Sequence, residues 1–552
     1  MFHALLFEIN AIHDYLFASG RLRDVAAASE LLERLTSREA PDNLLDATAR
    51  AAGVTVEETT EAPRGEEVVF TRRAGGAFYA FSERPEPLQR LRDLWTLALQ
   101  QAAPNLSFSL GMGEGRDLPA AFDAARAALR ADNQQPRPQL PAAAPVAERS
   151  RRTGLAGVKF GKTAKDGVLD AAIARRKPFA DLSTGSFLDR FSPDRAGLGW
   201  RDWPRNLEPE EDDRDGAFPF VGEARTVALL HADGNGLGLL LRRINEVVRK
   251  KPERFVDLYD QFSRLVEDVT AEAARQATAE VLLPAREREG TSCLPARPIL
   301  LGGDDILVLL RADLAMDYLQ TFTRAFEAES AEQLERLKEK TDIEDLPKRL
   351  TLGAGLVYLR ASQPFHLAMR LAESLITEAK RLAKTVSPTN PPSAVAFYRV
   401  TSSLVEDYDD LLELTLTHHH AGHTYRDTLG PYFLDDQAPR LAHLIELTEL
   451  LGSEGMARGP TRQLLTLMGH AEGEARQRYR RWRMRMGEKR QGELKRFAMF
   501  FERLTGSPLP EDLPYAPSKR WDDVLVSPLG DALALMGAGH VSQKKTAEED
   551  AA

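Results

Sequence analysis

Residues 297–310 read RPILLGGDDILVLL, in which two apolar runs flank Gly302, Gly303, Asp304 and Asp305. Apolar segments that meet at a tight glycine turn are typical of a β-hairpin with buried strands, and we predict one here. Adjacent carboxylates at such a tip repel each other and are desolvated by the strands, so a divalent cation is their natural neutraliser. The alternative is an Asp-rich surface turn without a ligand. The rest of the sequence decides between the two.

The composition indicates a multidomain globular protein. With 552 residues the chain is too long for one hydrophobic core, and its 43% hydrophobic and 28% charged residues are ordinary for this class. Its net charge of −10 excludes a protein that coats nucleic acid with its whole surface, so any such contact needs a local basic patch. The single cysteine, Cys293, excludes an internal disulfide and a multi-cysteine zinc site, so no zinc is expected.

The N-terminal residues favour a cytoplasmic protein. Residues 1–17 (MFHALLFEINAIHDYLF) are apolar, but they include Glu8 and lack a basic leader, so they do not resemble a signal peptide. The sequence has no run of eighteen apolar residues, which argues against a membrane span. We therefore expect a cytoplasmic location and no membrane partner.

An internal repeat is the main clue to the architecture. Three blocks of the first half recur in the same order in the second half: ALLFEINAIHDYL (4–16) as ALLHADGNGLGLL (228–240), RAGGAFYAF (73–81) as the GGDD hairpin, and FSLGMG (108–113) as LTLGAG (350–355). Chance similarity of short apolar strings is the alternative, but the shared order favours a duplication. Each copy predicts strand, helix, hairpin, helix, strand, which is a ferredoxin-like unit with an antiparallel sheet and helices on one face. The expected fold class is α+β, with two ferredoxin-like palm domains.

The two copies differ where chemistry would occur. The second copy carries three carboxylates for which the gapless alignment offers no acidic counterpart: Ile9, Ala77 and Phe78 stand opposite Asp233, Asp304 and Asp305. We therefore expect the second copy to hold a metal and the first copy not to. The second copy also contains a charged segment at 332–348, which we predict to be an extra helix.

Shifts in composition predict five segments. The stretch 133–147 (NQQPRPQLPAAAPVA) is rich in Pro and Ala, which is typical of an extended linker. The last dozen residues are polar and charged, which is typical of a disordered tail. The predicted organisation is a first, degenerate palm-like domain at 1–132, a linker and connecting region without zinc cysteines at 133–215, a second palm domain with GGDD at 216–432, a helical C-terminal domain at 433–540, and a disordered tail at 541–552.

The carboxylates match the needs of a palm-type nucleotidyltransferase. Such an enzyme gathers carboxylates from two neighbouring strands around a pair of Mg²⁺ or Mn²⁺ ions, which bridge triphosphate oxygens and activate a 3′-hydroxyl. Asp233 ends the first strand of the second copy, and in a split βαβ sheet that strand lies beside the hairpin. We predict that Asp233, Asp304 and Asp305 cluster there as the catalytic and metal-binding residues.

Residues around these carboxylates indicate a nucleotide-binding role. Backbone N–H groups at the start of a helix can hold phosphate oxygens, and a lysine can neutralise a triphosphate. A solvent-exposed lysine without such a role is the alternative for Lys380. On these grounds the predicted nucleotide-binding residues are Gly234, Asn235, Gly236, Gly302, Gly303 and Lys380, with Gly302 and Gly303 shaping the hairpin turn.

A run of histidines gives a weaker indication. His418, His419, His420 and His423 resemble a metal site, but consecutive side chains cannot all face one ion, so we expect a polar loop. For His231, on the strand before Asp233, we favour packing over contact with a base.

A basic segment begins at Arg476 and ends at Arg496, with Tyr479 and Trp482 interleaved. It can lie along an RNA phosphate backbone or against an acidic partner subunit, and a solvated basic face is the alternative. Gly487 interrupts the segment, so we do not expect one continuous surface.

Several of these stretches together resemble the second palm domain of the large subunit of type III CRISPR effector complexes: HADGNGLG, RPILLGGDDILVLL, TLGAGLVYLRASQPFHLAMRLAESLITEAK and SAVAFYRVTSS. That family has two palm-like domains, of which only the second keeps GGDD, and this matches the unequal repeat. The opening FEINAIHDYLFASGRLRDVAAASELLERL is similar to the family's first palm, and RSRRTGLAGV with DAAIARRK resembles its connecting region. The resemblance covers most of the chain and is most specific in residues 227–403.

The resemblance implies synthesis of cyclic oligonucleotides, commonly cyclic oligoadenylates, from ATP, with Asp233, Asp304 and Asp305 binding the metal ions. It also implies guide RNA, target RNA and other effector subunits as partners. The family often has a cysteine zinc knuckle in the connecting region, and this sequence lacks those cysteines. The family often begins with a histidine-aspartate nuclease domain. Nothing precedes the first palm in this sequence, so we expect no cleavage of single-stranded DNA by such a domain.

Two other functions remain open from the sequence. A diguanylate cyclase using GTP shares the palm-like fold, but Ile306 and Leu307 replace the Glu-Phe of its GGDEF signature, and the duplicated architecture is not typical of it. A non-catalytic scaffold that binds RNA or effector subunits is the second alternative. The carboxylate trio argues against a scaffold, because desolvated unpaired acids are a liability without a role.

Overall fold

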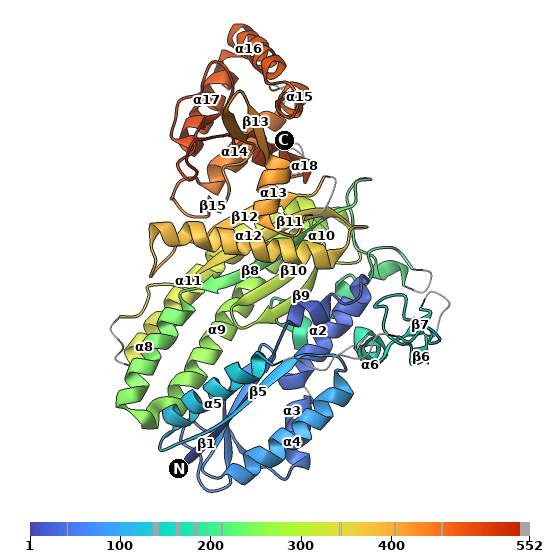
Figure 1. The fold of residues 1–552 in the computed structure, drawn as a ribbon, viewed down its shortest axis with the longest axis vertical. Coiled ribbons are helices and arrows are strands. Elements are labelled where there is room, and N and C mark those ends of the chain that lie inside the picture. Colours follow the sequence, from blue (N-terminus) through green and yellow to red (C-terminus); the bar gives the residue numbers. More distant parts are fainter. Residues whose placement is uncertain are drawn as a thin grey trace.

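The computed structural model describes residues 1–540 apart from 41, 136–142, 162–165, 182–185, 195, 211–212, 342, 344, 402–404, 454–455 and 457. The predicted disordered tail and part of the predicted linker therefore lie outside the described residues. Figure 1 shows an elongated molecule in which two α/β units and a C-terminal helical region follow one another along the long axis. The N-terminus lies at the end opposite the C-terminal helices (Figure 1).

The N-terminal α/β unit is a five-stranded sheet with the order β2-β3-β4-β1-β5. Its longer strands are mostly apolar, because side chains on both faces of the sheet are buried. Its strands are β1 (Phe2–Ile9), β2 (Val56–Glu57), β3 (Val68–Ala74), β4 (Ala77–Ser82) and β5 (Phe108–Gly115). Its helices are α1 (Ile12–Leu16), α2 (Leu22–Thr36), α3 (Leu44–Ala51), α4 (Pro85–Ala102) and α5 (Leu118–Asn133).

The second α/β unit is a six-stranded sheet with the order β15-β12-β11-β8-β10-β9. The pairs are antiparallel except β11 with β12, which is parallel. Its strands are β8 (Thr226–Asn235), β9 (Ala296–Gly302), β10 (Asp305–Arg311), β11 (Thr351–Arg360), β12 (Ala394–Arg399) and β15 (Tyr432–Phe433). Its helices are α8 (Leu237–Lys250), α9 (Phe255–Ala277), α10 (Leu283–Glu289), α11 (Ala315–Thr341) and α12 (Phe365–Val386).

The duplication predicted from the sequence is visible in the topology. The order β3-β4-β1-β5 in the first sheet corresponds to β9-β10-β8-β11 in the second, so both copies pair their first strand with the hairpin on one side and the last strand on the other. The α+β fold with two palm domains is confirmed. The charged segment predicted to be helical at 332–348 is helical as far as Thr341, where it forms the end of α11.

The tips of the two hairpins touch each other. A Cβ added at Gly75 would lie 3.5 Å from the carbonyl carbon of Gly302, and one added at Gly302 would lie 3.4 Å from the Cα of Gly75. Both added atoms would be in ordinary van der Waals contact with the other tip. The first palm therefore packs directly against the GGDD turn of the second.

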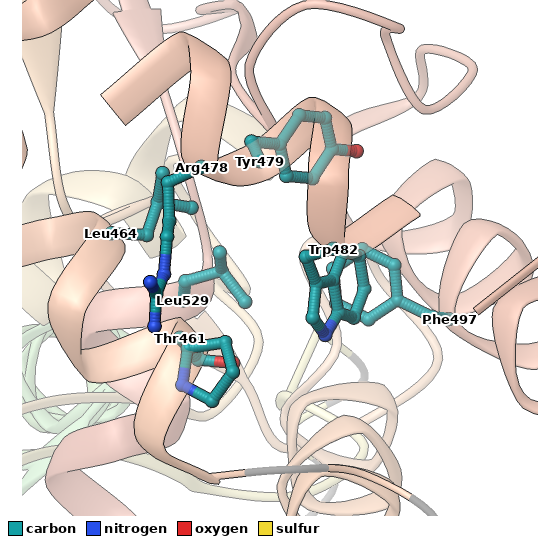
Figure 2. A pocket seen from close by; sticks show the side chains of 8 residues that line it. Thr461, Leu464, Arg478, Tyr479, Trp482, Phe497 and Leu529 are labelled. Carbon is teal, nitrogen blue, oxygen red and sulfur yellow. The ribbon is translucent and has the colours of Figure 1, made fainter. Parts of the chain in front are cut away.

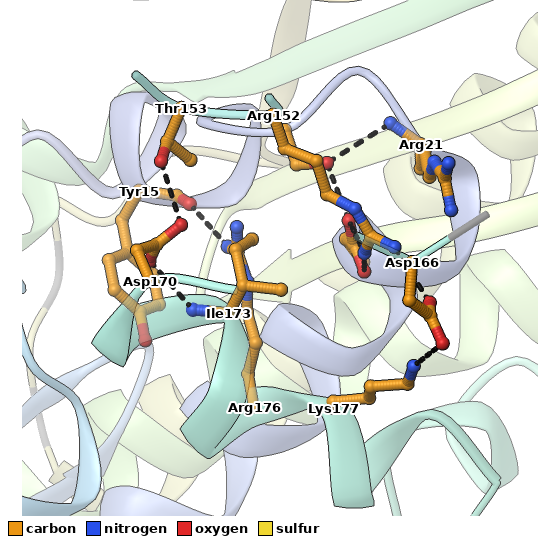
Figure 3. A network of polar contacts seen from close by, with 11 residues as sticks. Tyr15, Arg21, Arg152, Thr153, Asp166, Asp170, Ile173, Arg176 and Lys177 are labelled. Atoms are coloured by element: carbon orange, nitrogen blue, oxygen red, sulfur yellow. Dashed lines mark hydrogen bonds and ion pairs between the residues drawn. The ribbon is translucent and has the colours of Figure 1, made fainter. Parts of the chain in front are cut away.

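Buried ion pairs anchor the connecting region to the first palm. Arg152 donates from Nη1 to both carboxylate oxygens of Asp24 on α2, each at 2.8 Å, and from Nη2 to Asp166 at 2.8 Å. Lys177 also contacts Asp166, at 2.5 Å, as Figure 3 shows. The elements of this region are β6 (Lys159–Phe160), β7 (Val168–Leu169), α6 (Ala171–Arg176) and α7 (Ser186–Asp189).

Removing Asp24 should therefore destabilise the chain. The side chain of Arg152 is only 7% exposed, so Asp24→Ala strands half of its guanidinium in the interior. Loss of one partner of a buried pair costs about 3–5 kcal/mol. We expect the free energy of unfolding in urea to fall by about this amount. Glu66→Ala is the matched control, because Glu66 pairs with Arg90 at the surface, 3.7 Å away, where such pairs contribute little. An equal effect of the two substitutions would contradict the anchoring role.

The C-terminal region combines helices with a four-stranded sheet of order β13-β14-β17-β16. This sheet joins strands from both sides of the predicted boundary between 432 and 433, and the domain boundaries stay predictions. Its strands are β13 (Thr417–His420), β14 (His423–Arg426), β16 (Ala516–Pro517) and β17 (Val524–Val526). The helices are α13 (Tyr408–Leu411), α14 (Leu441–Gly452), α15 (Arg458–Met468), α16 (Glu472–Lys489), α17 (Gln491–Thr505) and α18 (Leu529–Gly537).

The histidine run forms a hairpin rather than the polar loop that we expected. His418 to His420 lie in β13, and His423 begins β14. Strand alternation turns successive side chains to opposite faces, and they find different partners. His418 Nε2 lies 3.0 Å from Asp427, and His420 contacts the carbonyl of Met468.

The basic segment is divided between α16 and α17, and the break falls at Arg490 rather than at Gly487. Tyr479 and Trp482 stack at 5.7 Å and turn toward Phe497, around a cavity of about 10 Å³ (Figure 2). These rings pack inside the helical region and do not form an exposed stacking platform. Arg476 and Arg480 both pair with Asp512, so part of the positive charge is neutralised within the chain.

Membrane insertion finds no support in the helices. Within the part of the chain that the structure describes, none of them is both long enough and apolar enough to cross a bilayer.

Candidate active site

The strand register places the three predicted carboxylates at the same end of the sheet. Asp233, near the end of β8, stands directly opposite Asp305, the first residue of β10. The hairpin turn is Gly303-Asp304, closed by the pair Gly302 and Asp305, and Gly303 has a φ of 62°. That left-handed conformation suits glycine. Gly234 then donates its N–H to the carbonyl of Asp304 at 3.2 Å, which fixes the turn over the end of β8.

Asp304 is an unusual acid. Burial, followed by the neighbouring charge of Asp233 and a hydrogen bond with it, raises the pKa of Asp304 to about 8. Two carboxylates that share a hydrogen bond in a largely buried site cannot both ionise without a counter-charge. A bound cation would supply that counter-charge and displace the proton.

Asp305 is held in its ionised form by histidines. Burial opposes its ionisation, but His231, with His13 and Lys380, outweighs burial and lowers the pKa of Asp305. His231 Nε2 lies 2.6 Å from Asp305 Oδ1. Burial likewise disfavours the charged imidazole, but Asp305 overcomes this and raises the pKa of His231. The packing role that we favoured for His231 is therefore incomplete.

Alternation along β8 was the signal for this contact. His231 lies two residues before Asp233, so both side chains project from the same face of the strand. His13 had no comparable signal, because it comes from α1 in the first palm and reaches Asp305 only through the packing of the two palms.

Lys380 reaches the carboxylates from α12. Its ammonium group pairs with Asp233 and donates to the carbonyl of Gly234 at 3.2 Å. The side chain is 20% exposed, so it is not the solvated surface lysine of the alternative interpretation. Lys380 crosses β11 at Gly353, where an added Cβ would lie 2.5 Å from Lys380 Cγ. The glycine therefore makes room for the lysine.

Gly353→Ala tests this arrangement. The new methyl group displaces Lys380 from Asp233, and a misplacement of about 1 Å can cost 10²-fold in rate. We expect the rate of metal-dependent nucleotide transfer to fall about 10- to 100-fold. The double variant Gly353→Ala with Lys380→Ala should be no slower than Lys380→Ala alone, because both remove the same contact. If the losses in rate from the two substitutions add up in the double variant, they do not act through the same contact, and the arrangement is contradicted.

The predicted phosphate-binding glycines differ in their availability. Gly234 and Asn235 belong to β8. The backbone N–H of Gly234 donates to the carbonyl of Asp304, and the side-chain amide of Asn235 donates to the Thr351 hydroxyl at 3.3 Å. Gly236 instead precedes α8 with a φ of 87°. The phosphate contact proposed for this turn therefore falls to Gly236 and the first N–H groups of α8, where the helix dipole favours anions.

A cavity of about 240 Å³ opens beside the GGDD turn. It lies between the hairpin and α5 of the first palm and the helices α8 and α9 of the second. Cations, aromatic rings and the tip carboxylate line it, among them Arg72, Tyr79, Arg126, Tyr259 and Asp304. Arg72 donates to the Tyr79 hydroxyl at 3.2 Å, and its guanidinium lies 5.4 Å from the ring centroid. The cavity therefore offers positive charge and flat apolar surface next to the carboxylates.

The first palm keeps one acid at its own hairpin. Its turn is closed by Ala74 and Ala77, and Ala77 stands opposite Glu8. By this register Glu8, not Ile9, occupies the place of Asp233. The gapless alignment was wrong by one residue. In the first hairpin the closing pair, Ala74 and Ala77, lies outside both glycines, whereas in the second hairpin Gly302 is itself a member of the closing pair. Tyr79 donates a hydrogen bond from its hydroxyl to Glu8, and the sequence of the hairpin tip, AGGAF at 74–78, contains no acid.

The donor set suits a hard divalent cation. Asp233, Asp304 and Asp305 offer carboxylate oxygens, which Mg²⁺ and Mn²⁺ prefer. The hydrogen bond that Asp304 shares with Asp233, next to the charge of Asp305, is the structural sign that a cation fits. The predicted two-ion site is compatible with these residues, and its occupancy stays a prediction.

Comparisons with known proteins agree with this description. Residues 226–386 match the family model described as Cas10/Cmr2, second palm domain. No curated protein matches the chain. Among solved structures, Csm1 in T. onnurineus is 14% identical with a TM-score of 0.50, and the match covers 98% of this chain and 69% of that one. A Csm1–Csm4 cassette in complex with cA4 is 12% identical with a TM-score of 0.49, covering 98% and 70%.

The chain is shorter than these relatives. It spans 64% of a chain of the Csm1–Csm4 subcomplex in the type III-A CRISPR-Csm interference complex, at 13% identity and a TM-score of 0.44. At such identities a structural likeness shows the fold, while the family model identifies the domain. Residues 226–386 therefore match the second palm domain of the Cas10/Cmr2 family, and the chain as a whole resembles the large subunit of type III CRISPR effector complexes, as its sequence predicts.

Proposed function

We propose that this protein is a metal-dependent nucleotidyltransferase that makes cyclic oligonucleotides, cyclic oligoadenylates from ATP, as signals in antiviral defence in the cytoplasm. The observation that carries the proposal is the meeting of Asp233, Asp304 and Asp305 beside a cavity of about 240 Å³ that both palms line. The match to the Cas10/Cmr2 second palm supports the reaction class. Guide RNA, target RNA and other effector subunits are the proposed partners.

In the proposed reaction a 3′-hydroxyl oxygen attacks the α-phosphorus of a second nucleotide. The bond between the α-phosphorus and the bridging oxygen to the β-phosphate breaks, pyrophosphate leaves, and the hydroxyl proton passes to solvent. Metal ions, when bound, supply charge neutralisation of the triphosphate and acidify the attacking hydroxyl. Asp304 would hold a cation in its carboxylate form, and His231 keeps Asp305 oriented.

Cationic side chains of the protein bind the phosphates of the nucleotide. Lys380 already points at Asp233 and can turn its ammonium group to a phosphate once a cation satisfies that carboxylate. The start of α8, at Gly236, comes two residues after Gly234, whose carbonyl accepts a hydrogen bond from Lys380. Arg72 and Arg126 of the first palm add positive charge in the cavity beside Asp304. The nucleotide is thus bound by residues of both palms, and the side chains of Tyr79 and Tyr259 line the cavity on the side of the base.

Product analysis tests the proposal. The purified chain is incubated with ATP or GTP separately, with Mg²⁺ or Mn²⁺, with and without RNA, and the products are resolved by mass spectrometry. Cyclic or linear oligoadenylates together with pyrophosphate are the expected result. Products from GTP alone would favour the diguanylate-cyclase alternative. Co-purified RNA with no metal-dependent turnover of any nucleotide would favour the scaffold and overturn the proposal.

A further inference from the structure

A second group of potential metal ligands lies where the two palms meet. His13 on α1 of the first palm faces His231 on β8 and Asp305 on β10 of the second. One ligand atom from each of the three residues lies within 4.8 Å of the other two. The imidazole rings are 5.0 Å apart between centroids and inclined by 77°. The carboxylate trio of the proposed function shares only Asp305 with this group.

The hydrogen bonds of His13 prepare it as a ligand. Its Nδ1 lies 2.7 Å from Glu373 on α12, so Nδ1 carries the proton that Glu373 accepts. Its Nε2 is buried and has no hydrogen-bond partner among the residues that the structure describes. That nitrogen faces Asp305 Oδ2 at 3.8 Å. In metal sites the ligating histidine commonly donates its other ring N–H to a carboxylate, which fixes the orientation of the ring.

The distances around Asp305 fit an ion with a small adjustment. His231 Nε2 lies 2.6 Å from Asp305 Oδ1, and His13 Nε2 lies 3.8 Å from Oδ2. Two ligands of a tetrahedral ion with bonds of about 2.1 Å lie about 3.4 Å apart. The two observed separations lie on either side of this value. Rotation of the Asp305 carboxylate can therefore bring both nitrogens and one oxygen to a common ion.

We propose that His13, His231 and Asp305 bind a first-row transition metal ion, such as Co²⁺ or Zn²⁺, at the junction of the palms. Imidazole nitrogens select such ions, whereas Mg²⁺ prefers oxygen donors. The ion is distinct from the pair assigned to Asp233, Asp304 and Asp305, and the two sites share Asp305. It fastens the first palm to the GGDD strand and orients Asp305. The expectation of no zinc came from the missing cysteines, which this histidine site does not need.

Cobalt binding tests the site without reference to activity. The full chain, stripped with a chelator, is titrated with Co²⁺ and followed by the visible absorption of nitrogen-ligated cobalt. We expect one equivalent to give this absorption and excess Mg²⁺ not to remove it. His13→Gln and His231→Gln should each abolish the absorption, and Glu373→Gln should weaken Co²⁺ binding about 10- to 100-fold.

Two controls keep the result specific. His419→Ala removes an exposed histidine outside the site and should leave the cobalt absorption unchanged. Asp304→Asn should also leave it unchanged while stopping nucleotide transfer, so that failure of the metal site and failure of the proposed function are distinguishable. Melting curves of the stripped variants show that each one folds. Absence of the absorption in the folded wild-type chain, or its persistence in both glutamine variants, would overturn the proposal in favour of a metal-free hydrogen-bond network.

Discussion

Replacing Asp304 and Asp305 together by asparagine is expected to reduce nucleotide transfer at least about a thousandfold, because the metal-held charge supplies several kcal/mol of transition-state stabilisation and each 1.36 kcal/mol is tenfold. Asparagine keeps the shape of both side chains but cannot neutralise two divalent ions. The measurement is the initial rate of pyrophosphate release from ATP with saturating Mg²⁺. Retained activity in this double variant would show that the site is elsewhere.

The same substitution at Asp304 alone should stabilise the metal-free fold. The pKa of Asp304 is about 8 in the folded chain, above its ordinary value of 3.8, so the unfolded chain loses this proton at lower pH than the folded chain does. The folded state therefore loses stability as pH rises between these two values. Asp304→Asn removes that loss. We expect its melting temperature in chelator to exceed that of the wild type most clearly at pH 8, and a lower melting temperature would contradict the assignment.

Replacing Lys380 by alanine is the second large effect. We expect kcat/KM for ATP to fall about 10²- to 10³-fold, the cost of losing one pre-placed donor to a developing charge. The fold should change little, because the Asp233 side chain is already 37% exposed with Lys380 in place and stays solvated without it. The measurement is the same pyrophosphate assay at several ATP concentrations.

Lys384→Ala is the matched control for this prediction. Lys384 lies one turn further along α12 and is exposed, so its loss should leave kcat/KM within about twofold of wild type, since surface charges away from a site contribute little. If Lys380→Ala were equally harmless, the ion pair with Asp233 would have no catalytic meaning. If both variants were equally slow, general charge rather than position would explain the loss.

The parts of the site that could be predicted are those that follow from one strand and its neighbour. Apolar runs around GGDD predict a hairpin, and the split βαβ order predicts that Asp233 lies beside it, as the pairing of Asp233 with Asp305 confirms. These inferences need only period-two alternation and topology. The gapless repeat predicted both palms for the same reason.

The parts that could not be predicted depend on packing between distant segments. His13 meets Asp305 only because the first palm docks on the GGDD turn through Gly75 and Gly302. The exact register of Glu8 depends on which residues close the first hairpin, which sequence spacing does not reveal. The basic segment was a similar case, since Asp512 pairs with its arginines from a loop beyond α17.

The central claim is that the three carboxylates hold the cations to which a nucleoside triphosphate binds. The most direct measurement is a crystal structure of the chain with Mn²⁺ and a non-hydrolysable ATP analogue, with the metal located by its anomalous scattering. The account predicts Mn²⁺ between Asp233 and the Asp304–Asp305 pair, with the triphosphate on the side of Lys380 and Gly236. Triphosphate bound elsewhere, with no metal at these three acids, would contradict it.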